Sequence, residues 1–196
     1  MTLFKNKYRI ESTRLPGYDY SSDGAYFVTI CTKDRIHHFG EIKGGKLTDT
    51  FQAKIARKCW FDLPNHYPQC ILDEFVIMPN HIHGIIIINN RNEHRTNNVI
   101  VETGFKPVST ITGGDEKTAS IINKRYSLSE MVRGFKTFSA RRINKCQNAI
   151  GRQFWQLRFY DHIIREGDDL YDLRQYIKTN PAKGERDRNN LEGLLM

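Results

Sequence analysis

Two histidines separated by one residue stand in the longest apolar stretch of the chain. His81 and His83 interrupt a run that extends from Glu74 to Ile88, and Asn80 precedes them. In an extended strand alternate side chains share a face, so both imidazoles should project from one side. Buried imidazole needs a hydrogen bond or a metal, and neutral imidazole is a common ligand of transition metals. The spacing therefore favours a pair that could hold one divalent ion, although histidines bonded to backbone carbonyls or solvent would show the same pattern.

A tyrosine and an asparagine lie four residues apart further along the chain. Tyr176 and Asn180 would share one face of a helix, which Pro181 should end at Asn180. If that face lay over the histidine strand, a divalent ion held by His81, His83 and Asn180 could polarise a phosphate oxygen. The phenolate of Tyr176 could then attack phosphorus and form a covalent intermediate. A half-buried packing tyrosine with a hydrated hydroxyl would look the same in sequence, and spacing alone does not place the helix over the strand.

Four segments carry strand or hairpin patterns. Residues 25–32 alternate in polarity and are rich in β-formers. Residues 39–47 predict a short hairpin that turns at Gly44 and Gly45. The histidine run is interpreted as one strand, and residues 154–165 are interpreted as a final strand with its approach.

Three segments carry helical patterns. Thr48 or Asp49 can cap a first helix that runs to about Asn65, with apolar residues at every fourth position. Residues 127–146 begin with a Ser-x-x-Glu capping box and form an amphipathic second helix. Residues 166–180 predict the third helix, which carries the tyrosine.

The outer face of the second helix is almost entirely basic, which favours contact with phosphate over an ordinary solvated face. The residues predicted to bind nucleic acid are those of this face and two that flank the last strand: Arg133, Lys136, Arg141, Arg142, Arg158 and Arg165.

The order of elements, β-(hairpin)-α-β-loop-α-β-α, predicts the α+β class. We expect a ferredoxin-like antiparallel sheet with the helices packed on one face. The 196 residues suit a single domain, 1–196. Residues of about 90–126 lose periodicity and are interpreted as an inserted mobile loop, and about 182–196 as a polar C-terminal tail.

Composition narrows the class of partner. Thirty Lys and Arg against 22 Asp and Glu give a net charge of +8, which favours a polyanion although solubility alone could explain it. Nine Tyr and eleven Phe could stack on bases. The four cysteines lack the spacing of a zinc knuckle or disulfide framework, residues 1–20 lack a secretory signal, and the apolar runs are too short to span a bilayer. We therefore expect a cytoplasmic protein without membrane contact.

Taken together, these residues resemble a known family, the single-tyrosine HUH transposases, and within it the REP-associated tyrosine transposases. The resemblance spans about residues 8–183 except the 90–126 loop. It is carried by the runs 15–20, 25–32, 78–83, 159–165 and 176–181.

The resemblance implies a ferredoxin-like HUH nuclease fold in a bacterial enzyme of DNA transposition and recombination. Such an enzyme cleaves and rejoins single-stranded DNA near REP-like hairpins. His81 and His83 match the paired metal ligands, Asn180 matches the third ligand, and the ion would be Mg²⁺ or Mn²⁺. Tyr176 matches the nucleophile, which forms a 5′-phosphotyrosine link and leaves a free 3′-OH.

Several alternatives remain open at this point. Tyr160 is a second candidate phenol, and His162 beside it is interpreted as structural. A non-catalytic relative that binds hairpin or single-stranded DNA is the alternative from another functional class, and a metal hydrolase using activated water is a third. The active protein could be a monomer or a homodimer.

Overall fold

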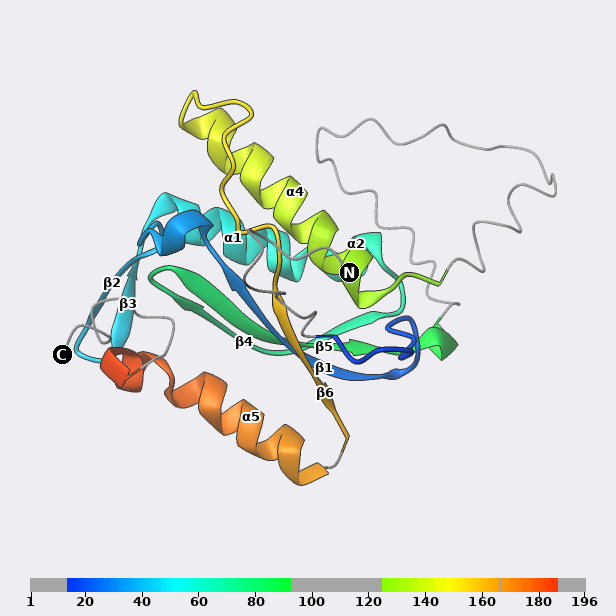
Figure 1. The fold of residues 1–196 in the computed structure, drawn as a ribbon. Helices are drawn as coiled ribbons and strands as arrows, with labels where there is room; N and C mark the ends of the chain where they lie inside the picture. The colour runs from blue at the N-terminus through cyan, green and yellow to red at the C-terminus, as the bar shows by residue number, and fades with distance from the viewer. Residues whose placement is uncertain (1–13, 93–124, 166, 187–196) are drawn as a thin grey trace, which may run out of the picture.

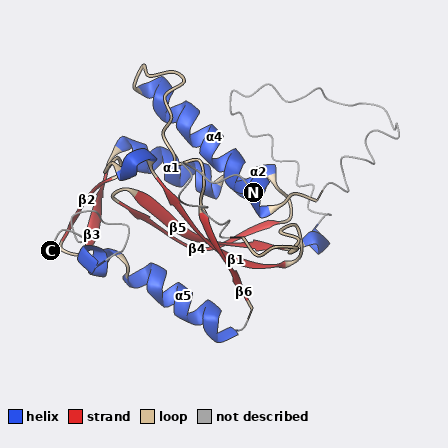
Figure 2. Cartoon of the chain, viewed as in Figure 1, coloured by secondary structure: helices blue, strands red, loops and turns tan. Residues whose placement is uncertain are grey.

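Four antiparallel strands form the central sheet of the computed structural model, which describes residues 14–92, 125–165 and 167–186 (Figures 1 and 2). Their order across the sheet is β4 (Cys70–Met78), β5 (His81–Ile88), β1 (Gly24–Cys31) and β6 (Tyr160–Ile164). With helices between β1 and β4 and between β5 and β6, this order is the ferredoxin-like arrangement. The predicted α+β class with an antiparallel sheet is confirmed. The predicted 90–126 loop and 182–196 tail lie largely outside the described residues.

The apolar run that carries the histidines is a hairpin of two strands, so its interpretation as one strand is wrong. β4 ends at Met78, β5 begins at His81, and these two residues pair across the turn. The reason lies in the two residues between them: Pro79 cannot donate a ladder hydrogen bond, and Asn80 is favoured in turns. Both histidines nevertheless lie on β5, so the prediction that they share a face is unaffected.

A separate two-stranded sheet precedes the first helix. It consists of β2 (Gly40–Lys43) and β3 (Lys46–Asp49), as the predicted hairpin required. Gly44 and Gly45 have φ of +59° and +74°, the left-handed conformation that a two-residue hairpin turn needs at both positions. Since β3 extends to Asp49, the cap of the following helix is Thr50, two residues later than the first predicted candidate.

Three helices cover one face of the sheet: α1 (Phe51–Phe61), α2 (Leu63–His66) and α4 (Leu128–Cys146) (Figure 1). The predicted capping box at the start of α4 is present, with Ser127 and Glu130 bonded to each other's backbone N–H groups. The predicted first helix is broken at Asp62, and Pro64 stands in the first turn of α2.

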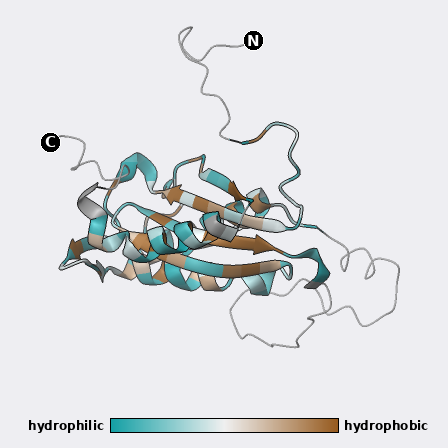
Figure 3. Cartoon of the chain, turned by 90° about the horizontal axis from the view of Figure 1, so that it is seen from below, coloured by the Kyte–Doolittle hydropathy of each residue, from teal (hydrophilic) through white to brown (hydrophobic). Residues whose placement is uncertain are grey.

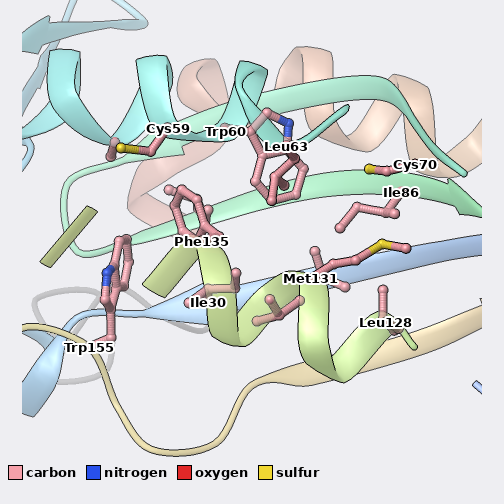
Figure 4. Close-up of a cluster of buried hydrophobic side chains, with 14 of the residues drawn as sticks. Ile30, Cys59, Trp60, Leu63, Cys70, Ile86, Leu128, Met131, Phe135 and Trp155 are labelled. Carbon is pink, nitrogen blue, oxygen red and sulfur yellow. The ribbon is translucent and has the colours of Figure 1, made fainter. Parts of the chain in front are cut away.

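The main hydrophobic core lies between these helices and the sheet (Figure 4). Trp60 of α1 and Phe135 of α4 meet edge to face with their ring centroids 5.5 Å apart, and both are fully buried. Gly84 of β5 gives Trp60 its space, because a Cβ at this position would lie 2.3 Å from the indole Cζ2. The helices of this face are therefore fitted closely to the strand that carries the histidines.

The last helix, α5 (Gly167–Thr179), lies on the opposite face of the sheet (Figure 1). It packs through Ile177, Leu170 and Leu173 onto a second apolar cluster that contains Phe27 and Ile85. The expectation that all helices share one face is therefore wrong. Nearly all residues of β1 and β5 are buried, so both faces of these strands need a cover. The strands of the sheet carry long hydrophobic stretches, drawn brown in Figure 3.

None of the helices in the described part of the chain has the length and hydrophobicity that a bilayer-spanning segment requires.

Candidate active site

The two histidine side chains meet on the face of the sheet that α5 covers. His81 and His83 are buried, with 1% and 2% of their surfaces exposed, and their Nε2 atoms lie 3.0 Å apart. The ring of Phe27, on the neighbouring strand β1, stacks on His83 at a centroid distance of 5.3 Å. The predicted pair of imidazoles on one face is thus present, in a site with little access for solvent.

Each imidazole is oriented by a hydrogen bond at its other nitrogen. Asn80 Oδ1 lies 2.7 Å from His81 Nδ1, and Thr29 Oγ1 lies 2.8 Å from His83 Nδ1. Because an amide oxygen only accepts, His81 must carry its proton on Nδ1 and direct the lone pair of Nε2 toward His83. Two lone pairs cannot face each other at 3.0 Å unless a proton or a cation lies between them.

The hydroxyl of Thr29 suits either case, because a hydroxyl can donate or accept. If His83 Nε2 carries the proton, Thr29 donates to His83 Nδ1. If a cation takes that place, His83 carries its proton on Nδ1 and donates to Thr29. The pair is therefore built so that both Nε2 atoms can serve as ligands without a change in hydrogen-bond partners.

The donor atoms fit a divalent ion. Two ligands about 2.1 Å from an octahedral ion and at right angles to each other are about 3.0 Å apart, which matches the separation of the Nε2 atoms. In residues 14–92, 125–165 and 167–186 no group of three or more His, Cys, Asp or Glu side chains could hold a metal. A third protein ligand from these ranges would thus have to be of another type. Asn180 offers one, since its Oδ1 is buried and accepts no hydrogen bond from the described residues.

Tyr176 reaches the histidine pair from α5. Its hydroxyl lies 3.4 Å from His83 Nε2, and the two rings meet edge to face at 5.3 Å. The tyrosine side is open, with 41% of the residue exposed, whereas Asn180, one helical turn later, is 3% exposed. The structure therefore brings the partly exposed Tyr176 to the buried His83, as predicted.

Two ion pairs fix the position of α5 on the sheet. Arg174 donates to both carboxylate oxygens of Asp73, with Nε 2.9 Å from Oδ1, and Lys178 lies 2.8 Å from Glu74. The hydrogen bond from Arg174 holds the pKa of Asp73 below its usual range. Asp73 and Glu74 occupy the irregularity in β4 between its two stretches of regular pairing, where successive carboxylates can both turn toward the helix. These pairs stand on either side of Tyr176 in sequence and hold its rotation about the helix axis.

The six predicted DNA-contact residues fall into two groups. Four are exposed, and none of these four forms an ion pair with a described residue: Arg133, Arg141, Arg158 and Arg165. The other two, Lys136 and Arg142, contact the protein itself.

Lys136 donates hydrogen bonds to the carbonyl oxygens of residues 156, 157 and 158, and burial lowers its pKa to about 8. Arg142 donates to Cys59 Sγ at 3.2 Å and lies 3.9 Å from Asp62. Lys136 therefore fastens the segment before β6 to α4, and Arg142 joins α4 to α1. We expect DNA contact to depend mainly on the four exposed arginines.

Sequence reasoning assigned no role to Thr29 or to the acidic pair in β4. Thr29 is paired with His83 only through the register of β1 against β5, which no local pattern reveals. Asn80 was visible beside the histidines, and its role follows from the hairpin turn that was not predicted.

No model of a known protein family matches the chain, but two related proteins and a solved structure are similar to it. The chain is 32% identical over 177 residues to an uncharacterised protein of Haemophilus influenzae, covering 90% of this chain and 91% of the other. A second protein of that organism, named "Putative REP-associated tyrosine transposase", is 24% identical over 169 residues, which is 84% of this chain and 74% of the other.

Among solved structures, the fold matches that of a REP-associated tyrosine transposase bound to a REP hairpin. The TM-score is 0.53 at 19% sequence identity, over 87% of this chain and 73% of the other. The four-stranded antiparallel sheet with its helices is thus the fold of that transposase. The chain is thus similar in sequence to a putative REP-associated tyrosine transposase and has the fold of another, in agreement with the resemblance seen in its sequence.

Proposed function

We propose that the protein cleaves and rejoins single-stranded DNA near hairpin sequences through a 5′-phosphotyrosine intermediate. The observation that carries the proposal is the convergence of the Tyr176 hydroxyl on His83 Nε2, 3.4 Å away and beside a second buried imidazole. A protein that only binds DNA has no need of a buried ligand pair beneath an accessible phenol. Sequence similarity to a putative REP-associated tyrosine transposase supports the same conclusion.

His81, His83 and Asn180 would hold Mg²⁺ or Mn²⁺. The bound ion would neutralise a non-bridging phosphate oxygen and so make the phosphorus more open to attack. The chain's own contribution is orientation: Asn80 and Thr29 fix the two rings, and α5 sets the height of the phenol above them.

In the cleavage step the oxygen of Tyr176 forms a bond to phosphorus while the bond from phosphorus to the 3′ oxygen breaks. The phenol gives up its proton to solvent, which its exposed side allows, and the departing 3′ oxygen takes up one proton. One phosphodiester replaces another, so the reverse attack by a 3′-OH can rejoin a strand without an external energy source.

The partner would be DNA with a hairpin and a single-stranded flank. The net charge of +8 and the exposed arginines of α4 support a polyanionic partner. A relative of similar fold is described as bound to a REP hairpin, which is the type of substrate we propose for this chain as well.

The test is a labelled hairpin DNA taken from the flanks of the gene, incubated with protein and Mn²⁺ and separated on a denaturing gel. Wild type should give a slowly migrating protein–DNA adduct, and Tyr176→Phe should give none. Tyr160→Phe is the matched control, because Tyr160 is an exposed phenol of the sheet on this face and should be dispensable for the adduct.

The alternatives predict different gels. An adduct that survives in Tyr176→Phe and disappears in Tyr160→Phe would move the nucleophile to Tyr160. Cleavage without adduct in both variants would indicate a metal hydrolase that uses water. Tight binding without adduct or cleavage would indicate a DNA-binding relative that has lost turnover.

A further inference from the structure

We propose that the exposed face of β6 is the surface on which the single-stranded flank of the DNA lies, with bases stacked on Tyr160 and His162. Arg158 and Arg165 would neutralise phosphates at the two ends of this surface. The inference rests on the proposed function, since it names where the substrate strand runs. It assigns stacking roles to two residues outside the ligand set and the nucleophile.

The pairing of β6 with β1 places alternate residues of β6 next to the histidine site. Tyr160 lies opposite Thr29, and His162 lies opposite Phe27. Directly opposed residues of antiparallel strands share a face. Thr29 and Phe27 are the residues that bond to and stack on His83, so Tyr160 and His162 stand in the next column of the same face.

None of the described segments covers this part of the face. The alternation along β6 places Ile163 against the main core and Ile164 in the cluster beneath α5. From there α5 crosses the sheet to its ion pairs with β4, so it leaves the first half of β6 open (Figure 1). Tyr160 is 47% exposed, and His162 is also exposed. Within the described residues neither side chain forms a hydrogen bond or a ring contact.

The spacing and the charge of these side chains suit an extended single strand of DNA. Alternate residues of a strand lie about 6.8 Å apart, which is about twice the 3.4 Å rise per nucleotide of stacked DNA. Two successive bases can therefore stack on Tyr160 and His162 only when the bases are not stacked on each other, as in an extended single strand. Aromatic rings bind bases of any sequence, and flanking arginines follow the backbone. Arg158 and Arg165 are exposed at the two ends of β6.

The position also determines the expected role of Tyr160. Tyr160 is paired with Thr29 across the strands and forms no hydrogen bond with a described residue, whereas the Tyr176 hydroxyl lies 3.4 Å from His83 Nε2. A stacking role needs the ring and not the hydroxyl. Tyr160→Phe should therefore behave as wild type in DNA binding, and Tyr160→Ala should not.

The experiment measures fluorescence anisotropy of a dye-labelled hairpin DNA with and without a single-stranded tail. All proteins carry Tyr176→Phe, so that cleavage cannot affect the result. Tyr160→Ala and His162→Ala should each weaken binding of the tailed DNA by about 5- to 150-fold, since stacking on one base contributes about 1–3 kcal/mol. Binding of the hairpin without a tail should stay unchanged, and Tyr160→Phe should bind both DNAs normally.

Two controls define the site. Phe61→Ala removes an exposed aromatic ring from α1, on the other face of the sheet, and should leave both affinities unchanged. Abasic nucleotides in the tail should weaken the binding of the starting protein as much as Tyr160→Ala does. The tyrosine change should then have no further effect on the abasic DNA.

Several results would overturn the assignment. The assignment is wrong if the tail adds no affinity, or if Tyr160→Ala and His162→Ala keep the full contribution of the tail. If wild type is a dimer and Tyr160→Ala a monomer by light scattering, β6 instead pairs with a second copy of the chain. If Tyr160→Ala lowers the melting temperature, Tyr160→Leu tests the loss of the aromatic ring while most of the side-chain volume is kept. If wild type forms no adduct in the catalytic assay but the tail still adds affinity through Tyr160 and His162, the proposed chemistry is wrong and the assignment of this surface holds.

Discussion

Replacing Thr29 by valine tests whether the histidine pair is built for a cation. Valine keeps the shape of threonine and removes the hydroxyl that lies 2.8 Å from His83 Nδ1. Thr29 and His83 are 6% and 2% exposed, so water cannot easily replace the lost partner. A buried nitrogen left without its hydrogen bond costs about 1–3 kcal/mol.

Both forms of the site lose this hydrogen bond, but the metal-bound form loses the stronger one. When Nε2 is a ligand, the cation strengthens the bond that His83 Nδ1–H donates to Thr29 Oγ1, whereas in the metal-free form Thr29 donates to a neutral nitrogen. Loss of such an outer partner lowers metal affinity about 10- to 100-fold, which is about 1.4–2.7 kcal/mol. We expect this weakening of Mn²⁺ binding to Thr29→Val, measured by calorimetry in the absence of DNA.

Thr29→Ser keeps the hydroxyl and should bind Mn²⁺ nearly as tightly as wild type. Thr137→Val is a matched change on α4, where the hydroxyl bonds to a backbone carbonyl and is exposed, and it should have no effect. If Thr29→Val melts at the wild-type temperature and binds Mn²⁺ within twofold of wild type, the hydroxyl does not orient His83 and the reasoning is refuted.

Three further predictions concern the fold around the site. Asp73→Asn breaks the bidentate pair with Arg174 and so loosens α5, which should slow adduct formation several-fold. Hairpin affinity should stay unchanged, because the exposed arginines remain in place. Equal losses in rate and affinity would contradict this prediction. Gly84→Ala forces a methyl group toward Trp60 and should lower the free energy of unfolding by about 1–3 kcal/mol in urea denaturation, whereas an unchanged value would show that the core can yield. Burial raises the pKa of Asp161, so its stabilising contribution is full in acid and is lost as pH rises through that pKa. Asp161→Asn should therefore raise the melting temperature at pH 7 and lose this advantage toward pH 3; a variant less stable than wild type at pH 7 would refute the sign.

Local rules predicted the parts of the site that depend on neighbours in sequence. The period of two in a strand places His81 and His83 together, and the helical pattern places Tyr176 in the last turns of α5, with Asn180 directly after the helix. The capping box of α4 and the end of α5 before Pro181 also follow from short-range chemistry.

Contacts between distant segments could not be predicted in this way. The position of α5 depends on which sheet face the first helices leave open, so the arrival of Tyr176 at His83 required the full fold. The hydrogen bond from Thr29 depends on strand register. Lys136 and Arg142 look like surface charges in the sequence, yet both are bound to other parts of the protein.

The identity of the residue that carries the DNA tests the proposed phosphotyrosine mechanism most directly. The adduct from the Mn²⁺ reaction would be digested with nuclease and protease, and the modified peptide sequenced by mass spectrometry. The account predicts a nucleotide attached through its 5′ phosphate to Tyr176. A nucleotide on Tyr160, or on any other side chain, would contradict it.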